Sequence, residues 1–259
     1  MPAGVRWARF RTQGGDTGFG TCTDAGIAVY DGDLFAGARP TGLHLATGEF
    51  TLQCPCNPSK IVALWNNFHE LCAKLGKLAP GRPFFLIKPS TCVVGPEERI
   101  KRPRTYAGKV VFEGELGIVI GRHCKDIEIA EAGAAIFGFT CVNDVTAAEL
   151  IKENADFEQW CRSKGFDTFG CLGPVIATGL DLTGLHVITR VNGDVRQNYP
   201  LSDMVISPAA LVSRLSCDMT LLPGDVIACG TSVGVGSMKE GSTVEVSIDG
   251  IGVLRNTFG

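Results

Sequence analysis

The sequence predicts a β-dominated α+β fold, with a small β-rich N-terminal module followed by a larger domain. Short runs rich in Val and Ile recur along the chain, and few long stretches repeat apolar residues at helical spacing. Glycine is abundant (33 residues) and proline moderate (13), which is typical of strands joined by tight turns. With 259 residues, 45% of them apolar, the chain can bury a substantial core.

The N-terminal module is expected to span residues 1–57. Its predicted strand segments are short: VRWARFRT, GIAVYDGDLFAG and GEFTLQCPC. Asp31-Gly32-Asp33 predicts a hairpin turn, because glycine adopts positive φ angles at no steric cost.

The larger domain is expected to span residues 58–259. KIVALW (60–65) predicts a buried strand, and NNFHELCAKLGK predicts a helix because its apolar residues recur at helical spacing. A strand and turn are expected in FFLIKPSTCVVGP, followed by a Val- and Ile-rich strand over 109–121.

Further along this domain, an Ala-rich helix is predicted to lead into a buried strand, AIFGFTCVND, that ends at Asp144. A helix is predicted over VTAAELIKENADFEQWCRSK, with Thr146 as N-cap and Glu149 completing a capping box. From residue 170 the pattern returns to strands, with a hairpin at Asn192-Gly193 and one interrupting helix, SPAALVSRLSCDMT.

Composition argues against several classes of protein. The formal net charge is −3 and there is no long basic run, so no nucleic-acid partner is expected. No apolar stretch reaches the roughly 18–20 residues that a membrane span needs, and the first residues do not resemble a secretory signal. Eleven cysteines at scattered spacings suggest neither a disulfide framework nor a zinc site. We therefore expect a cytoplasmic protein.

Glu113-Gly114-Glu115 is the most informative motif. Residues i and i+2 of a strand point to the same face, so two carboxylates would lie together within an otherwise apolar strand. They would repel each other and be costly to bury, unless a hard divalent cation such as Mg²⁺ or Mn²⁺ binds them. The alternative is that both lie on the solvated face of an edge strand.

Asp144 is the expected third metal ligand, because it ends a buried strand where the chain turns. Three carboxylates on one side of an octahedron leave positions for water and a chelating substrate. A 2-oxo acid fits such positions, since its carboxylate and keto oxygen can bind together while the metal acts as a Lewis acid.

Several segments occur in a characteristic order: KIVALWNNFHEL, FFLIKPSTCVVGP, VVFEGELGIVIG, FGFTCVNDVTA, RSKGFDTFGCLGPVI, VNGDVRQNYPLSDM, LLPGDVIACGTSVGVG and IDGIGVLRN. In this order they resemble the fumarylacetoacetate hydrolase family, from about Lys60 to Phe258. The resemblance implies a catalytic domain folded as a mixed β-roll, which usually forms a homodimer.

The resemblance also implies roles for particular residues. The family holds Mg²⁺ or Mn²⁺ through an E-x-E pair and a later Asp, which match Glu113, Glu115 and Asp144. Lys164, in RSKGFD, matches a family lysine beside the metal that would stabilise an enolate or bind the substrate carboxylate. Asp167, in the same motif, would orient Lys164.

Substrate contacts are implied at four further positions. Thr231, in the segment CGTS, would bind the substrate carboxylate, and Ser232 stands where the family usually has proline. Lys88 would line the pocket and Gln197 would contact the substrate. Taken alone, Lys88 and Gln197 are equally plausible as surface residues.

Many hydrolytic members carry a His and, three residues later, a Glu on a short helix, and this pair activates water. His69 matches the His, but Cys72 stands at the Glu position. Glu70 is adjacent, yet neighbouring residues on a helix point about 100° apart. A neutral Cys cannot orient a His as a carboxylate does. His69 is still expected to act as a general acid or base, because its ordinary pKa is near neutrality.

These features predict an enzyme for a small 2-oxo acid. The first hypothesis is a C–C hydrolase of a 2,4-dioxo acid (acylpyruvate, fumarylpyruvate or fumarylacetoacetate type) that forms an enolate at the metal. The second is an isomerase, tautomerase or decarboxylase of an oxo-diene dicarboxylate or oxaloacetate-like acid, which needs no activated water. The third is a catalytically silent binding relative, against which three clustered acids argue, since without metal they would destabilise the fold.

Overall fold

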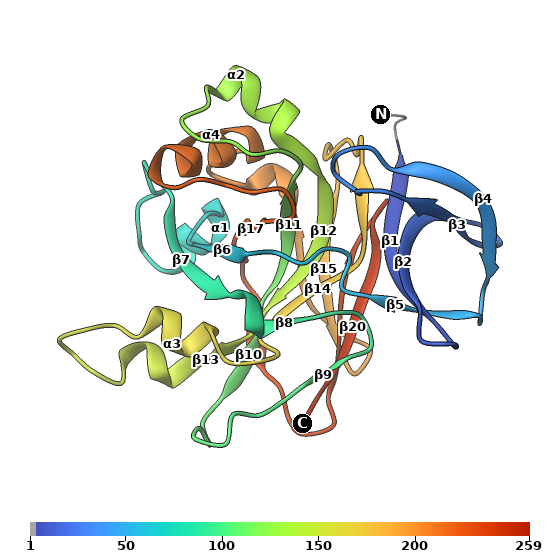
Figure 1. Cartoon of the computed structure of the whole chain (residues 1–259). Helices are drawn as coiled ribbons and strands as arrows, with labels where there is room; N and C mark the ends of the chain where they lie inside the picture. Colours follow the sequence, from blue (N-terminus) through green and yellow to red (C-terminus); the bar gives the residue numbers. More distant parts are fainter. Residues whose placement is uncertain (1–3) are drawn as a thin grey trace.

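Strands dominate the computed structural model, which describes residues 4–259 (Figure 1). Two large sheets and a small one form the body, and the first five strands form a lobe on the right of Figure 1. The prediction of a β-dominated α+β fold with an N-terminal β module is confirmed.

The largest sheet contains twelve strands within the described residues. Their bounds are β1 (Val5–Thr12), β2 (Thr17–Thr23), β3 (Gly26–Asp31), β4 (Arg39–Ala46), β5 (Phe50–Gln53), β6 (Lys60–Trp65), β7 (Phe84–Pro89), β8 (Val93–Val94), β11 (Gly114–Ile120), β12 (Ile136–Asp144), β14 (Gly170–Thr178) and β17 (Val226–Ala228). The order is β4-β3-β2-β1-β14-β12-β11-β17-β6-β7, while β5 pairs with β1 and β8 with β14. The N-terminal module thus continues the sheet, because β1 runs antiparallel to β14.

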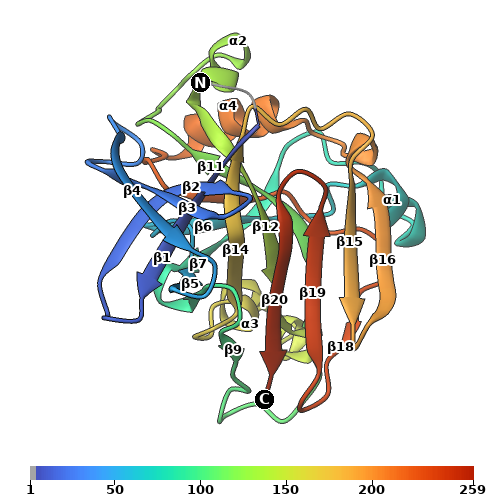
Figure 2. The same ribbon diagram turned by 90° about the vertical axis from the view of Figure 1, so that its right-hand side faces the viewer.

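A second sheet has the order β16-β15-β19-β20-β9, and its four longer strands face the viewer in Figure 2. Its members are β9 (Arg99–Ile100), β15 (His186–Val191), β16 (Asp194–Pro200), β19 (Thr243–Ile248) and β20 (Gly252–Phe258). Strands β19 and β20 pack against β12 and β14, so the main core lies between the two sheets. The small third sheet, of order β13-β10-β18, contains β10 (Val110–Phe112), β13 (Thr146–Ala147) and β18 (Gly236–Ser237).

The helices are short and lie outside the sheets. Their bounds are α1 (His69–Lys74), α2 (Ile129–Ala132), α3 (Trp160–Lys164) and α4 (Pro208–Asp218), with single 3₁₀ turns η1 (Ser90–Cys92), η2 (Gly133–Ala135), η3 (Ala148–Lys152) and η4 (Leu201–Asp203). Helix α4, which begins with a proline, packs against α2 at the top of Figure 1. Among residues 4–259, no helix has the length and apolar character needed to cross a bilayer.

One local prediction was wrong, and one was correct only in part, because the expected hairpin of β3 and β4 forms but with a longer loop. The helix expected to start at Thr146 is instead β13, η3, a loop and only then α3. Glu149, the supposed capping-box residue, accepts hydrogen bonds from the Tyr106 hydroxyl and from the Lys109 amide (2.8 Å). The turn expected at Gly32 is a longer loop, because β3 ends at Asp31 and β4 starts only at Arg39.

Candidate active site

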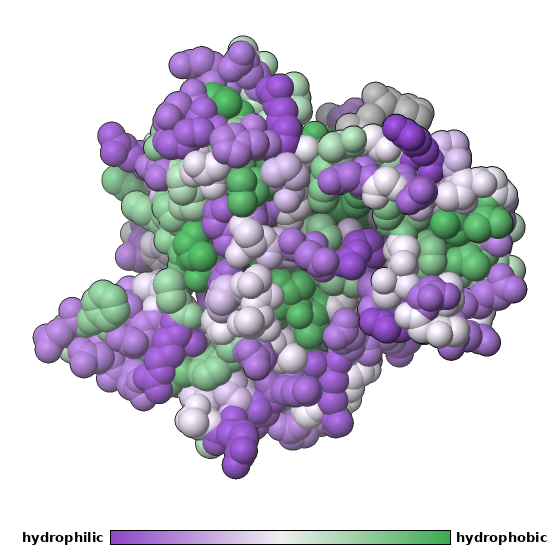
Figure 3. Space-filling model, in the orientation of Figure 1, coloured by the Kyte–Doolittle hydropathy of each residue, from purple (hydrophilic) through white to green (hydrophobic). Residues whose placement is uncertain are grey.

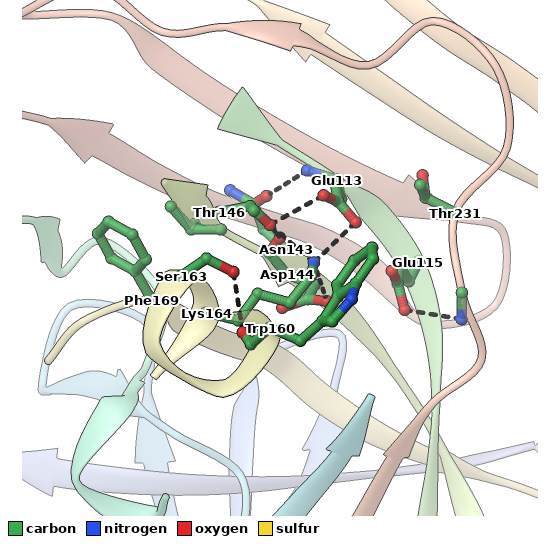
Figure 4. Close-up of polar contacts among 12 residues, drawn as sticks. Glu113, Glu115, Asn143, Asp144, Thr146, Trp160, Ser163, Lys164, Phe169 and Thr231 are labelled. Carbon is green, nitrogen blue, oxygen red and sulfur yellow. Dashed lines mark hydrogen bonds and ion pairs between the residues drawn. The ribbon is translucent and has the colours of Figure 1, made fainter. Parts of the chain in front are cut away.

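The three predicted metal ligands lie together where β10, β11 and β12 meet (Figure 4). Glu113 occupies the break between β10 and β11, Glu115 is the second residue of β11, and Asp144 ends β12. Each offers a carboxylate oxygen, and these oxygens lie within 4.8 Å of one another. Glu115 and Asp144 are fully buried, whereas Glu113 keeps partial access to solvent.

Gly114, between the two glutamates, packs too closely for any side chain. A Cβ there would lie 2.0 Å from Thr189 Oγ1. Its carbonyl accepts hydrogen bonds from Tyr199 (2.6 Å) and Thr231 (3.0 Å), and its N–H donates to Gln197 Oε1 (3.0 Å). These contacts fix the backbone that carries both glutamates.

Two buried lysines surround Asp144. Lys164 Nζ lies 2.6 Å from Asp144 Oδ2, 2.9 Å from Glu113 Oε2 and 2.7 Å from Thr146 Oγ1. Lys88 Nζ donates to Asp144 Oδ1 and to the carbonyl of Phe169 (2.9 Å). Both ammonium groups are therefore held by carboxylates and by polar groups of the surrounding turns.

Burial and charge shift the pKa values of these groups in different directions. Burial alone would raise the pKa of the Asp144 carboxyl, but the ammonium groups of Lys164 and Lys88 outweigh it and lower that pKa. Burial would lower the pKa of Lys164, but the carboxylates of Asp144, Glu113 and Glu115 raise it. Burial, together with the charges of Asp144 and Glu113, raises the pKa of Glu115 well above its usual range.

Glu115 supports a metal site most directly. Its Oε2 accepts a hydrogen bond from the Gly230 N–H (2.8 Å), whereas its buried Oε1 has no hydrogen-bond partner within residues 4–259. A buried carboxylate oxygen without a partner is costly. A hard divalent cation bonded to oxygens of Glu113, Glu115 and Asp144 would satisfy it, so the donor set fits Mg²⁺ or Mn²⁺.

Of the expected substrate-binding residues, Gln197 and Thr231 hold the site together. Gln197 Nε2 donates to Thr231 Oγ1 (2.8 Å), while its Oε1 accepts from Gly114. The Thr231 hydroxyl donates in turn to the Gly114 carbonyl. Ser232 is fully buried, and its hydroxyl has no hydrogen-bond partner among the described residues.

Two expected residues, His69 and Asp167, stay apart from the cluster. His69 is exposed at the start of α1, and Asp167 is exposed after α3; neither side chain enters a hydrogen bond or ion pair within residues 4–259. Lys164 is oriented by Glu113, Asp144 and Thr146, which leaves no contact for Asp167. Cys72 is buried with its thiol 3.5 Å from the Asn66 carbonyl, so it does not replace the missing glutamate.

Sequence reasoning missed the role of Thr146. Its hydroxyl donates to Glu113 Oε1 (2.8 Å) and accepts from Lys164. It lies two residues after Asp144, the spacing that brings side chains to one face of extended chain. The incorrect helix prediction obscured that signal.

Comparison with known proteins places the chain among two described families. Residues 60–259 match the family described as fumarylacetoacetate (FAA) hydrolase C-terminal, and residues 5–55 match the family described as Rv2993c-like, N-terminal. Protein Rv2993c of Mycobacterium tuberculosis is 42% identical over 83% of this chain and 81% of its own length.

Two solved structures share the whole fold. The 2-hydroxyhepta-2,4-diene-1,7-dioate isomerase from Mycobacterium marinum superposes with a TM-score of 0.88 at 36% identity, covering 98% of each chain. The fumarylacetoacetate hydrolase from Exiguobacterium antarcticum gives a TM-score of 0.82 at 29% identity, covering 98% of this chain and 99% of the other.

Proposed function

This chain belongs to the fumarylacetoacetate hydrolase family, and from that premise we propose that it is a divalent-metal-dependent enzyme that stabilises the enolate of a small 2-oxo acid. The observation that carries the proposal is the buried carboxylate trio, with one Glu115 oxygen unpartnered and Lys164 beside it. Members of the family are generally hydrolases or isomerases.

The charges of the site favour a single substrate carboxylate beside the metal. Three carboxylates and the two ammonium groups of Lys88 and Lys164 leave one net negative charge. A divalent cation reverses it to one positive charge, which a monoanionic 2-oxo acid neutralises. Since the site is buried, this balance favours one substrate carboxylate beside the metal, so the second carboxylate of a dicarboxylate would have to lie outside this cluster of charges.

In the proposed mechanism, Glu113, Glu115 and Asp144 hold the cation. When bound, the cation supplies a Lewis acid for the substrate carboxylate and keto oxygen. Lys164 remains protonated and stabilises negative charge that develops on the substrate oxygen. The buried Ser232 hydroxyl donates to the substrate carboxylate.

The type of reaction depends on whether the site can activate a water molecule. C–C hydrolysis of a 2,4-dioxo acid requires an activated water, and His69 is the residue expected to provide it. The structure gives His69 no carboxylate partner within residues 4–259. Position 72, where many hydrolytic members carry a Glu, holds a Cys whose thiol faces the Asn66 carbonyl. This observation favours isomerisation, tautomerisation or decarboxylation, which need metal and enolate stabilisation but no activated water. Hydrolysis is the second candidate.

Proton NMR of the Mg²⁺- or Mn²⁺-loaded enzyme with an acylpyruvate, fumarylpyruvate, oxaloacetate and a 2-hydroxy-diene dicarboxylate tests the proposal. We expect double-bond migration, keto–enol exchange or loss of CO₂ without release of pyruvate from the acylpyruvates. Release of pyruvate together with a second acid would establish hydrolysis instead. No metal-dependent conversion of any of these acids would contradict the proposed function.

A further inference from the structure

We infer that the 2-oxo acid bound by this chain carries an apolar arm, and that this arm lies in a groove walled by Trp65, Trp160 and Phe84. The inference rests on the proposed function and narrows its substrate class. It distinguishes this chain from a dioate-specific enzyme, because a second carboxylate would have to enter an apolar groove.

The groove lies between β7, α3 and η3 and has a volume of about 1120 Å³. The ring centroids of Trp65 and Trp160 are 5.7 Å apart, and those of Trp65 and Phe84 are 6.2 Å apart, so the three rings form one aromatic wall. Phe84 and Phe157, which also lines the groove, are 51% and 72% exposed. In Figure 3, apolar side chains interrupt the polar surface over this part of the molecule, at the lower left.

Helix α3 connects the groove to the carboxylates. Trp160 and Lys164 are four residues apart on α3, so their side chains leave the same face of the helix. Trp160 lines the groove, whereas Lys164 contacts Glu113 and Asp144. In the view of Figure 4, the side chains of Trp160 and Lys164 both extend from α3 toward the carboxylate trio.

Strand β7 makes the same connection independently. Phe84, Leu86 and Lys88 alternate onto one face of the strand. Phe84 and Leu86 line the groove, and Lys88 reaches Asp144. Leu86 and Lys88 are two residues apart, or about 7 Å along a strand, so a substrate held at the carboxylates can extend an arm of a few atoms into the groove.

Two of the charged side chains that line the groove, Glu158 and Arg162, already have polar partners, whereas Lys152 has no ion pair within residues 4–259. Glu158 accepts a hydrogen bond from Trp160 Nε1 (2.6 Å), and Arg162 forms an ion pair with Glu153. Lys77 lies over the Trp65 ring, 5.6 Å from its centroid. An arm ending in a carboxylate would therefore lose hydration against aromatic rings, whereas an apolar arm would gain from burial.

The test compares the affinities of three stable 2-oxo acids for the Mg²⁺-loaded protein by calorimetry. 2-Oxo-4-phenylbutanoate has an aryl arm, 2-oxobutanoate has a short one, and 2-oxoadipate ends in a second carboxylate. We expect the aryl acid to bind at least about tenfold more tightly than either of the others, because the phenyl group leaves water for an apolar groove. Tenfold corresponds to about 1.4 kcal/mol of binding free energy.

Substitutions of the groove residues test whether the substrate arm lies in the groove. Trp65→Ala and, as a milder change at an exposed position, Phe84→Ala should each reduce the ratio of aryl to short-arm affinity several-fold. Leu43→Ala, at an exposed apolar residue of β4, should leave that ratio unchanged. In a Trp7→Phe background only Trp65 and Trp160 fluoresce, so the aryl acid should quench emission there.

The outcomes separate the two proposals. Metal-dependent binding without a preference for the aryl acid would contradict the inference of an apolar arm but not the proposed function. The same holds for a preference for 2-oxoadipate that the Lys152→Ala variant loses. A Trp65→Ala variant with a changed oligomeric state but an unchanged affinity ratio would also contradict the apolar arm. In that case a second copy of the chain would cover the groove. No metal-dependent binding of any of the three acids would overturn both.

Discussion

Asp144 is held more tightly than any other predicted ligand, because each of its carboxylate oxygens faces a buried ammonium group. Glu113 shares only one of those lysines and keeps partial access to solvent. Both residues are predicted metal ligands, but Asp144 contributes more to the stability of the fold. Substituting each should therefore separate metal binding from stability.

We expect Asp144→Ala to abolish metal binding and to reduce the free energy of unfolding by about 3–5 kcal/mol, since it leaves Lys88 and Lys164 buried without their shared partner. Glu113→Ala should also abolish metal binding but destabilise the fold much less. Calorimetric titration with Mn²⁺ and urea unfolding measure the two effects. If both variants lost the same free energy of unfolding, Asp144 would not be the main partner of Lys88 and Lys164.

Lys164→Met should retain the metal but lower kcat by about 10²–10³, the usual effect of removing one group that stabilises an oxyanion. Metal content and kcat are measured on the same preparation. Lys164→Arg is the matched control, because it keeps the positive charge and should retain more activity. A Lys164→Met variant with full turnover would restrict Lys164 to balancing charge within the fold.

The sequence predicted those site residues that stand close together in the chain or at the end of a recognisable strand. Glu113 and Glu115 share a motif, and Asp144 ends a recognisable strand, so all three could be named as one group. The burial of Lys88 could not be predicted, because its partner Asp144 lies on a separate strand, and the family resemblance suggested only that it lines a pocket. The role of Thr146 was hidden by a capping-box pattern that tertiary contacts override.

At the scale of elements, the strand predicted over 109–121 is two strands that belong to different sheets. Strand β10 pairs with β13 and β18, whereas β11 pairs with β12 and β17. Both halves are apolar and Val- and Ile-rich, so no local pattern marks the break at Glu113. The contacts of Gly114 with β15, β16 and the turn at Thr231 hold the chain there.

We expect Gly114→Ala to destabilise the protein by about 1–3 kcal/mol, the usual cost of overpacking, because its Cβ would meet Thr189 Oγ1 at 2.0 Å. Thr189→Ala removes that oxygen, whose hydroxyl has no partner within the described chain. The double variant should recover much of the loss in thermal unfolding. If Thr189→Ala gave no rescue, the strain would have to arise elsewhere around Gly114.

At the scale of the whole molecule, the two lysines change what metal removal should do. Three clustered acids alone were expected to destabilise a metal-free fold. In the structure Lys88 and Lys164 neutralise two of the three carboxylate charges, and the trio lies between strands held by the large sheet. The metal-free protein should therefore be folded but less stable than the loaded one.

Chelation with EDTA should abolish activity reversibly while the protein stays folded. Adding Mg²⁺ or Mn²⁺ at about 100 times its Kd should restore activity and stabilise the fold by about 2.7 kcal/mol, the value that mass action gives for a ligand of the native state. Thermal unfolding with and without metal measures this, and Glu115→Ala, which removes the ligand with the unpartnered oxygen, serves as control and should show no metal-dependent shift in Tm. Global unfolding on chelation would mean that the lysines do not balance the carboxylates. An undiminished shift in Glu115→Ala would place the stabilising metal away from this site.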